Sequence, residues 1–502
     1  MELERITPEQ AGISGEKVKD CIQKLMHDKT QMHGFMAARD GKVFAEGWWT
    51  PYGPERIHCN HSLGKSYTAA AIGILYTQRK LKLEERVVDL FADELRQYGI
   101  EPDENMKKLT VYHVLTMTNG MARHPIMDAD WLKNYLAEPV VAEPGTEFLY
   151  NSSGSCLLGA IVKKKTGKGM REFLKEFLFD KIGIDGERFQ IFRFPDGYDA
   201  EPGTASVTED NLRLAILFMN YGNWNGEQII AEDWMHMAMS CQISTEPNGG
   251  TEDYRHGYGF QLWNSAIPGV YRFDGGQGQY GLIWPERKIA VAIHEGAVMP
   301  EGPQITLDVL YEYLLNEMRN EPLPEDPQAD AALLEFERNL KVPEQEANTL
   351  YVPTECFSGS YAVVSGDGDP WISVAPGGYN FFTCFYHDDK KQAFTDFTLK
   401  MDEQKCVFTV DGYAVFEAYF DGKHHPVYTD NVLPEIGWNC SYARYLDEDT
   451  LQITTKWLNG WFDDRIVMKK KGDILEMTFY KDRLTVSDNR YTIKHCTAKR
   501  QQ

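Results

Sequence analysis

The spacing of hydrophobic and polar positions changes along the chain, and it predicts where helices and strands lie. Apolar residues recur every three to four positions in the segments SLGKSYTAAAIGILYTQRKL, LTVYHVLTMTNGM and GSCLLGAIVKKKTGK, as they do in helices with a buried face. The segment FMAARDGKVFAEGWW predicts a β-hairpin that turns at Asp40-Gly41. The segment VYRFDGGQGQYGLIWPERKIAVAIHEG predicts a strand, a glycine-rich turn and two further strands. Residues 1–321 therefore form one region of mixed helices and strands.

The pattern changes after residue 321. Proline and acidic residues dominate 322–350, with one short helical piece, which is typical of a linker. From 351 to 502, short alternating strands are separated by Asp-Gly, Asn-Gly and Gly-Asp turns. Turns at intervals of eight to twelve residues are typical of a small antiparallel barrel or sandwich. We expect the loop Trp457–Trp461 to contact the first domain; the alternative is that both tryptophans lie inside the barrel.

Composition and charge narrow the range of partners. The chain has 502 residues and a formal net charge of −23. This charge argues against nucleic acid and anionic membranes as partners, because their phosphates would be repelled. The nine cysteines include no CxxC pair, which indicates reduced thiols. The first residues contain no apolar signal region, and no run of about eighteen apolar residues occurs. We therefore expect a cytoplasmic protein.

The motif SxxK occurs twice, and its two copies differ in context. Ser14 and Lys17 lie in a polar stretch, where a serine that caps a helix and a solvated lysine explain the pair. Ser62 and Lys65 instead open an apolar helix. At this spacing the two side chains share one helix face, and a lysine held against apolar surface loses its proton more easily. Ser62 is therefore a candidate nucleophile, while a helix cap with a surface lysine remains the alternative.

Two further motifs carry candidate chemistry. Tyr150 precedes an apolar helix; a phenol beside a lysine can pass a proton to a leaving group, although a core tyrosine is the simpler interpretation. The stretch FDGGQGQYGLIWPE places glycines at a strand edge, where N–H groups can face an oxyanion. Its GxGxxG match predicts no dinucleotide site, because a strand pattern follows where a helix should begin. His58 and His61 flank Ser62, and we interpret them as structural rather than metal-binding.

Taken in order, these motifs resemble the serine β-lactamase and penicillin-binding-protein superfamily, and most of all its class C β-lactamase-related branch of esterases and D-aminopeptidases. The similarity covers about residues 5–320. It implies an α+β fold: an antiparallel five-stranded sheet flanked by helices, with a helical subdomain. It also implies that Ser62 is acylated, that Lys65 and Tyr150 transfer the proton, and that the N–H groups of Ser62 and Gly276 form the oxyanion hole. Similar hydrolases carry an appended barrel, here expected to be lipocalin-like over 351–502.

The sequence departs from the family pattern at two points. Ser152 stands where the family has an asparagine, and Phe273-Asp274-Gly275 replaces its Lys-Thr-Gly. Losing that cation removes a partner for the β-lactam carboxylate, and Asp274 would repel it. We therefore predict poor activity on β-lactams. The predicted substrate-binding residues are Ser152, Phe273, Asp274, Gly275 and Gln277.

The sequence thus predicts a serine hydrolase that cleaves small esters or amides through an acyl-enzyme, with no metal and no organic cofactor. One alternative is a D-amino-acid-specific peptidase or amidase of the same family. The others are a catalytically silent penicillin-binding or ligand-binding protein, and a penicillin-binding regulator or transpeptidase. The expected partner is a small ester, amide or short peptide. The oligomeric state and the acyl group stay open.

Overall fold

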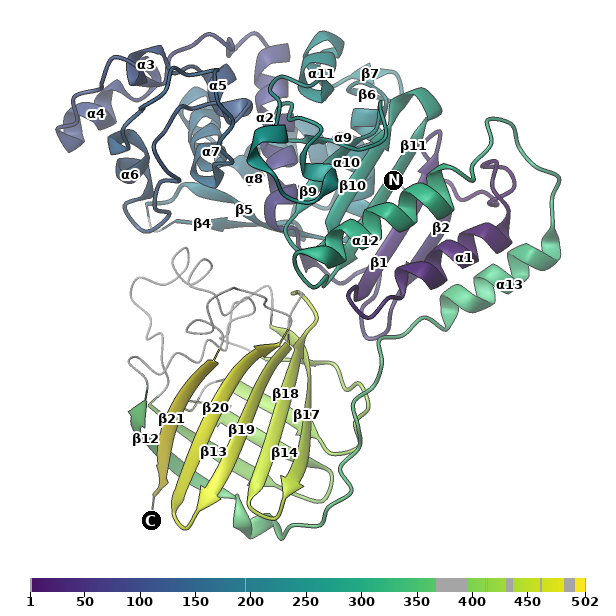
Figure 1. The fold of residues 1–502 in the computed structure, drawn as a ribbon, viewed down its shortest axis with the longest axis vertical. Helices are drawn as coiled ribbons and strands as arrows, with labels where there is room; N and C mark the ends of the chain where they lie inside the picture. The colour runs from purple at the N-terminus through teal and green to yellow at the C-terminus, as the bar shows by residue number, and fades with distance from the viewer. Residues whose placement is uncertain are drawn as a thin grey trace.

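The fold was analysed in a computed structural model, which describes residues 2–194, 196–366, 395–410, 412, 414–429, 437–460, 463–482 and 493–501. The chain forms two bodies, a mixed helical and β part at the top of Figure 1 and a barrel below it. The barrel contains the C-terminal strands, and the segment that joins the two bodies runs down one side of the molecule. No helix in the described part of the chain combines the length and apolar character needed to cross a membrane.

The N-terminal part is built on a six-stranded antiparallel sheet with the strand order β2-β1-β11-β10-β9-β8. The family resemblance implies five strands, and the two-residue edge strand β8 is the shortest of the six. The predicted hairpin and the predicted strands around the glycine-rich turn all belong to this sheet. Their bounds are β1 (Met32–Arg39), β2 (Lys42–Trp48), β8 (Trp263–Asn264), β9 (Tyr271–Gly275), β10 (Gln279–Trp284) and β11 (Ile289–Glu295).

Helices cover both faces of this sheet, so its strands are apolar on both sides. In β1, Phe35 and Ala37 belong to one hydrophobic cluster, while Met36 and Ala38 belong to another on the opposite face. This split follows from the alternation of side chains along a strand. The first cluster includes residues of α1 (Gly15–Leu25), α12 (Glu301–Leu310) and the following π-helical turn Tyr311–Leu315. The second includes residues of α2 (Gly64–Thr77) and α10 (Thr208–Met219).

A helical subdomain lies beside the sheet at the left of Figure 1 and is joined to it by α2. A three-stranded sheet of order β3-β5-β4 lies beneath these helices. The helices of the subdomain are α3 (Val87–Leu90), α4 (Ala92–Tyr98), α5 (Val111–Leu115), α6 (Trp131–Ala137), α7 (Ser152–Thr166) and α8 (Met170–Leu174). Two further helices, α9 (Asp180–Ile182) and α11 (Glu232–Met239), lie nearer the central sheet in Figure 1. The remaining strands are β3 (His58–Cys59), β4 (Gln190–Arg193), β5 (Asp199–Ser206), β6 (Asn223–Trp224) and β7 (Glu227–Gln228).

The segment predicted as a linker contains a docked helix. This helix, α13 (Pro327–Arg338), begins with Asp326 as its N-cap and proline at its first position, an arrangement that favours helix initiation. It lies alongside α1 in Figure 1. At the contact, a Cβ on Gly15 would come within 3.2 Å of the Ala329 backbone, so only a small residue allows this approach. Together with main-chain bonds of Leu323 to Glu9 and of Leu340 and Val342 to Thr50, this helix fixes residues 323–342 to the first domain.

Within the described C-terminal residues, nine strands form a closed barrel, and β16 (Val427–Tyr428) is attached to β17. Neighbouring strands are antiparallel except at the closure, where β15 and β17 pair in parallel. The reason is the number of strands: eight antiparallel pairings lead from β15 around the sheet to β17, so these two strands run in the same direction. A lipocalin barrel has eight strands, so the described barrel has one strand more than the expected lipocalin-like form. The nine are β12 (Gly359–Gly366), β13 (Asp396–Met401), β14 (Lys405–Val410), β15 (Ala414–Tyr419), β17 (Trp438–Asp447), β18 (Thr450–Trp457), β19 (Asp463–Lys471), β20 (Ile474–Asp482) and β21 (Ile493–Arg500).

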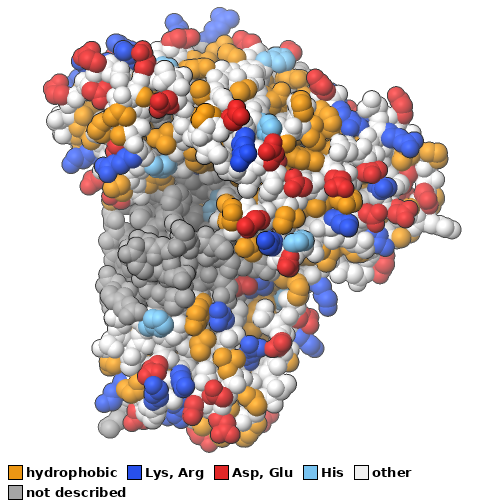
Figure 2. Space-filling view, in the orientation of Figure 1, with side chains coloured by type: hydrophobic (Ala, Val, Ile, Leu, Met, Phe, Trp, Pro, Cys, Tyr) orange, Lys and Arg blue, Asp and Glu red, His pale blue; other side chains and the backbone are white. Residues whose placement is uncertain are grey.

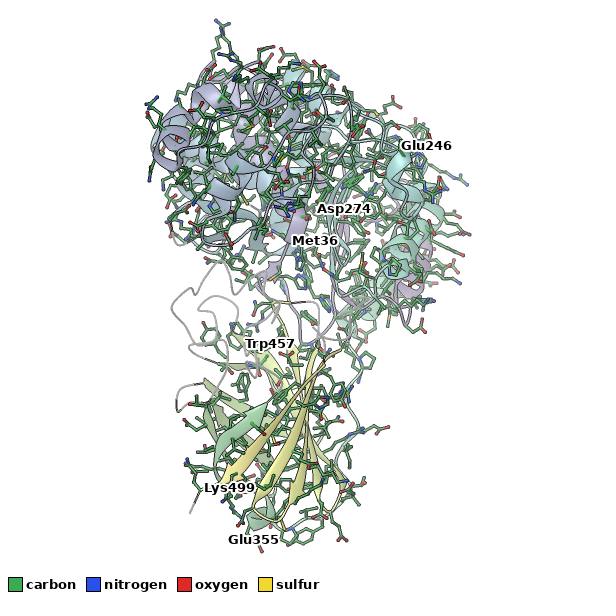
Figure 3. All side chains as sticks on the ribbon, turned by 60° about the vertical axis from the view of Figure 1, so that its left-hand side comes forward. Met36, Glu246, Asp274, Glu355, Trp457 and Lys499 are labelled. Atoms are coloured by element: carbon green, nitrogen blue, oxygen red, sulfur yellow. The ribbon has the colours of Figure 1, made fainter. Side chains whose placement is uncertain are left out.

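The loop after β18 joins the barrel to the first domain through Asn459. Its main-chain oxygen accepts a hydrogen bond from the Cys59 N–H at 2.8 Å, and its side-chain amide donates to the Ile57 carbonyl at 2.6 Å. Trp457 instead points into the barrel, where its indole N–H donates to Asp464 at 2.7 Å. Figure 3 shows Trp457 at the barrel end nearest the first domain. Trp461 lies outside the described residues.

Replacing Asn459 with alanine should loosen this contact. The change removes the donor to the Ile57 carbonyl and the acceptor of the Trp438 N–H, and it leaves both groups without that partner. We expect a loss of about 2–4 kcal/mol in the free energy of unfolding. Hydrogen exchange around residues 57–60 should accelerate. Asn348→Ala, which removes one bond from the Tyr445 N–H of the barrel and one to the Leu350 carbonyl within the linker, should leave that exchange unchanged. Unchanged exchange in Asn459→Ala would refute the contact.

Candidate active site

The nucleophile candidate lies where a short strand turns into a buried helix. Ser62 occupies the 3₁₀ turn His61–Leu63 between β3 and α2, and its hydroxyl lies 2.7 Å from the Nζ of Lys65. Lys65 is only 1% exposed, because α2 is apolar on nearly all sides. His61 has a φ of 50°, which is unusual for a residue other than glycine. Backbone in such conformations is concentrated at functional sites.

Tyr150 completes a compact group with Ser62 and Lys65. The Lys65 nitrogen lies 5.0 Å from the centre of the Tyr150 ring. The ring stacks on Trp263 at a centroid distance of 5.7 Å and meets Tyr258 edge-on. Burial raises the pKa of Tyr150 well above its usual value, a hydrogen-bonding contact with Ser62 opposes this, and the charge of Asp274 adds to it. The phenol therefore keeps its proton at neutral pH.

Helix α7 sets the position of Tyr150 and of Ser152. Asn151 is the N-cap of this helix, and its side-chain oxygen accepts hydrogen bonds from the Gly154 N–H at 3.0 Å and the Ser153 hydroxyl at 2.6 Å. The cap fixes the residues on either side of it. Ser152 is partly exposed, and its N–H donates to His124 at 2.8 Å.

The end of β9 lies directly against the serine turn. A Cβ at Gly275 would be 2.3 Å from the Asn60 carbonyl oxygen, so only glycine permits this approach. A Cβ at Gly276 would meet nothing within 4 Å, which means that the space beside this residue is open. The carbonyl of Gln277 accepts from the Ala297 N–H at 2.9 Å and holds the turn. The structure thus brings Gly275 and the neighbouring Gly276 to the segment that carries Ser62.

Phe273 and Asp274, which the sequence predicts to bind substrate, both have buried side chains. Phe273 is fully buried and packs edge-on against Phe218 of α10, so its side chain cannot contact a substrate. Phe273 occupies the face of β9 that is turned toward α10, which the sequence pattern did not indicate. Asp274 lies on the other face, where it is only 6% exposed.

Asp274 does not present a free negative charge. Its carboxylate accepts from the Arg272 Nε at 2.8 Å and from the Tyr254 hydroxyl at 2.9 Å. Arg272 also lies 3.6 Å from Asp253. Burial raises the pKa of Asp274, and the Arg272 charge opposes that shift. The predicted repulsion of a substrate carboxylate by Asp274 is therefore largely cancelled by Arg272.

Behind the serine turn lies a buried polar network that sequence reasoning missed. The rings of His58 and His294 stack at 4.6 Å, and His33 lies 2.9 Å from His58. His294 also contacts Asn60 at 3.0 Å and Asn211 at 2.9 Å. Burial lowers the pKa of His58 to about 4, so this imidazole is neutral at neutral pH. Such a network fixes the backbone just before Ser62, in agreement with the structural role expected for His58.

Burial also lowers the pKa of His61, the other histidine beside the serine. Its pKa falls to about 3, first through desolvation and then through the charges of His58 and Lys65. The described residues contain one trio of side chains with metal-ligand spacing, and neither His58 nor His61 is part of it.

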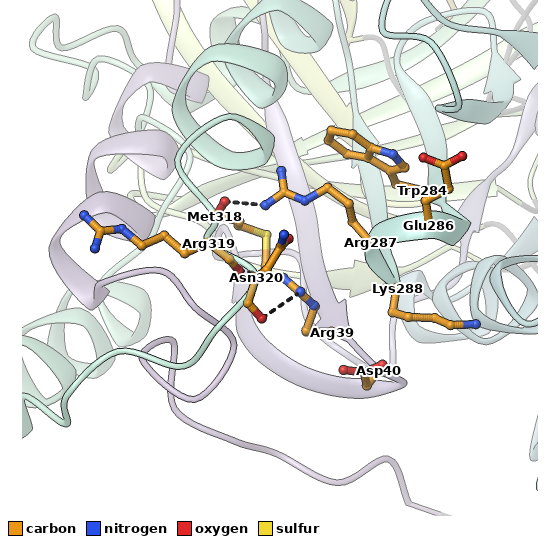
Figure 4. Close-up of a pocket in the computed structure, with 9 residues that line it drawn as sticks. All are labelled: Arg39, Asp40, Trp284, Glu286, Arg287, Lys288, Met318, Arg319 and Asn320. Atoms are coloured by element: carbon orange, nitrogen blue, oxygen red, sulfur yellow. Dashed lines mark hydrogen bonds between the residues drawn. The ribbon is translucent and has the colours of Figure 1, made fainter.

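The surface adds a second feature, a cavity at the opposite end of the central sheet. Its volume is about 780 Å³, and it lies at the Trp284 end of β10, whereas Gly275 pairs with Gln279 at the other end. Arg39 and Arg287 point their guanidinium groups toward main-chain carbonyls there (Figure 4). On the face shown in Figure 2, acidic and basic side chains are interspersed. This cavity is separate from the Ser62 site.

Comparisons with known proteins place the chain in one family. The Beta-lactamase family model matches residues 18–295. Penicillin-binding protein 4 of Amycolatopsis lactamdurans is 30% identical over 272 residues, which are 46% of this chain and 70% of that protein. Among solved structures, a penicillin-binding protein homologue from Caulobacter crescentus has 14% identity and a TM-score of 0.50, over 62% of this chain and all of that one. A family VIII carboxylesterase has 16% identity and the same score and coverage. The chain belongs to the beta-lactamase family.

Proposed function

We propose that this protein is a serine hydrolase that cleaves small esters or amides through an acyl-enzyme on Ser62. The observation that carries the proposal is the 2.7 Å contact between the Ser62 hydroxyl and the Lys65 nitrogen, in a helix that buries the lysine. Because the Tyr150 phenol keeps its proton, the Lys65 amine takes the proton of Ser62 as the hydroxyl attacks the substrate carbonyl. Tyr150 then relays a proton to the leaving group.

The tetrahedral intermediate would place its negative oxygen at the end of β9. The Ser62 and Gly276 N–H groups are the proposed donors, and the close approach of Gly275 to Asn60 brings that strand end to the serine turn. Collapse of the intermediate expels the alcohol or amine and leaves Ser62 acylated. Water then attacks the acyl-enzyme and releases the acid.

Esters are the proposed preferred substrates over β-lactams. The lysine of the family's Lys-Thr-Gly has no counterpart at Phe273-Asp274-Gly275, and the guanidinium of Arg272 is already paired with Asp274. A substrate carboxylate therefore gains no unpaired cation from this strand. The walls around Tyr150 are aromatic, with Trp263 and Tyr258 beside it, and such walls suit an uncharged acyl or leaving group.

The substrate preference can be measured with one panel. We expect short-chain p-nitrophenyl esters to be turned over with a kcat/KM at least about tenfold above that for nitrocefin, a difference that one unmatched charge contact can produce. D- and L-aminoacyl anilides test the amidase alternative in parallel. Equal kcat/KM values for nitrocefin and the best ester would contradict this preference.

A fluorophosphonate distinguishes a hydrolase from a silent binding protein. Attack by the Ser62 oxygen on phosphorus expels fluoride, and the mass of the chain increases by the phosphonyl group less one hydrogen. Intact-mass spectrometry should show one such adduct on the full-length protein. A chain that stays unmodified while it binds the esters reversibly would be a binding protein on the same scaffold.

A further inference from the structure

Three carboxylates from separate segments meet where the linker helix docks onto the start of the chain. Glu9 precedes α1, Glu325 precedes α13, and Asp330 lies in the first turn of α13. One oxygen of each side chain lies within 4.8 Å of the other two. Figure 1 shows α1 and α13 side by side in this region. The cluster lies outside the Ser62 site and has no part in the proposed hydrolysis.

Glu9 is buried, Asp330 is partly buried, and each has one buried oxygen that no donor of the described residues reaches, although the two carboxyl groups lie within hydrogen-bonding reach of each other. Glu9 is 1% exposed, and one of its oxygens accepts from the Gly15 N–H at 2.8 Å. The other oxygen of Glu9 and the Oδ1 of Asp330 have no hydrogen-bond partner within the described ranges. Buried carboxylate oxygens need a positive partner, because desolvation and mutual repulsion both disfavour their ionised forms. A single proton could bridge two of the three groups and would leave the third charge uncompensated.

We propose that Glu9, Glu325 and Asp330 bind a calcium ion. Calcium prefers carboxylate oxygens at 2.3–2.6 Å in a flexible shell, so two ligands on opposite sides of the ion lie about 4.8 Å apart. The spacing of the three oxygens fits this limit. The Thr7 hydroxyl, 3.2 Å from Glu325, extends the oxygen-rich surroundings, and water would complete the shell. Magnesium is a poorer match, because it requires a tighter octahedral arrangement.

An ion at this location would stabilise the docking of α13 onto the first domain. Glu9 belongs to the segment before α1, whereas Glu325 and Asp330 flank the start of the helix that leads toward the barrel. An ion held by all three would fix α13 to the first domain. It would act together with the apolar contact of α13, in which Leu333 is buried.

Calorimetry and thermal unfolding of the chelator-treated full-length protein test this site with calcium chloride, magnesium chloride and potassium chloride. We expect one calcium site, and a rise in Tm of about 3–5 °C at a hundredfold excess over Kd. Asp330→Asn should lose both responses, yet without calcium it should be at least as stable as the unsubstituted protein, because one repulsive charge is gone. Glu317→Gln, which removes a carboxylate that pairs with Lys17 of α1 and is not part of the trio, should keep both responses.

Three results would overturn the proposal. The first is no heat and no change in Tm with calcium, which would leave a shared proton as the explanation of the buried pair. The second is an undiminished calcium response in Asp330→Asn, which would place the ion elsewhere. The third is binding of magnesium in preference to calcium, which would contradict the argument from ligand spacing.

Discussion

Replacing Ser62 with alanine is expected to abolish ester turnover and fluorophosphonate labelling while the fold stays intact. The hydroxyl is the proposed site of acylation, and no other group in the SxxK turn can replace its oxygen. Its interaction with Lys65 is a single hydrogen bond at a partly exposed residue, so we expect a stability loss of about 1 kcal/mol or less. Intact mass after labelling, kcat for the best ester and the midpoint of denaturation measure the three quantities.

The second SxxK pair provides a matched control. Ser14 caps α1 by accepting from the Lys17 N–H at 3.3 Å, as its polar context predicts. Ser14→Ala should therefore cost about 1 kcal/mol of stability, as a lost cap does, and should keep full labelling. Labelling of Ser62→Ala to the same extent as the unsubstituted protein would place the nucleophile elsewhere and end the proposed mechanism.

Short-range patterns in the sequence predicted most of the elements around the site. The hairpin at Asp40-Gly41, the helix after Ser62 and the strands around the glycine-rich turn all formed where periodicity placed them. Each of these signals depends on neighbours within about fifteen residues. The parallel closure of the barrel was not predicted, because it depends on which distant strands become adjacent.

The candidate site also combines residues that local motifs predict with residues whose positions depend on distant contacts. Local motifs located Ser62, Lys65 and Tyr150, and the structure brings these three together. The face of β9 on which Phe273 lies was not deduced, because it depends on which helix covers the strand. Nor could spacing reveal that Asn459, about 400 residues away, bonds to the residues just before the serine. Contacts between residues so far apart produce no periodic pattern in the sequence.

The largest partial loss of activity is expected at Lys65. Lys65→Met keeps the volume of the buried side chain but removes the amine that takes the Ser62 proton, so we expect kcat to fall by about 10²–10⁴-fold, the range of general acid–base catalysis. Lys65→Arg should not restore activity, because a guanidinium keeps its proton at neutral pH. Tyr150→Phe should lower kcat by at least about 10²-fold, since it removes the proton relay and preserves the stacking on Trp263.

The control for the lysine is the other member of the second SxxK pair. Lys17 lies at the surface and pairs with Glu317 at 3.3 Å, so Lys17→Met should leave kcat and labelling unchanged. The decisive comparison is Lys65→Met against Lys65→Arg in single-turnover acylation. If lysine acts as the base, both variants acylate slowly, because neither offers an amine that can accept a proton. If arginine restores acylation, a positive charge beside Ser62 is sufficient, and the proton must leave the hydroxyl by another route.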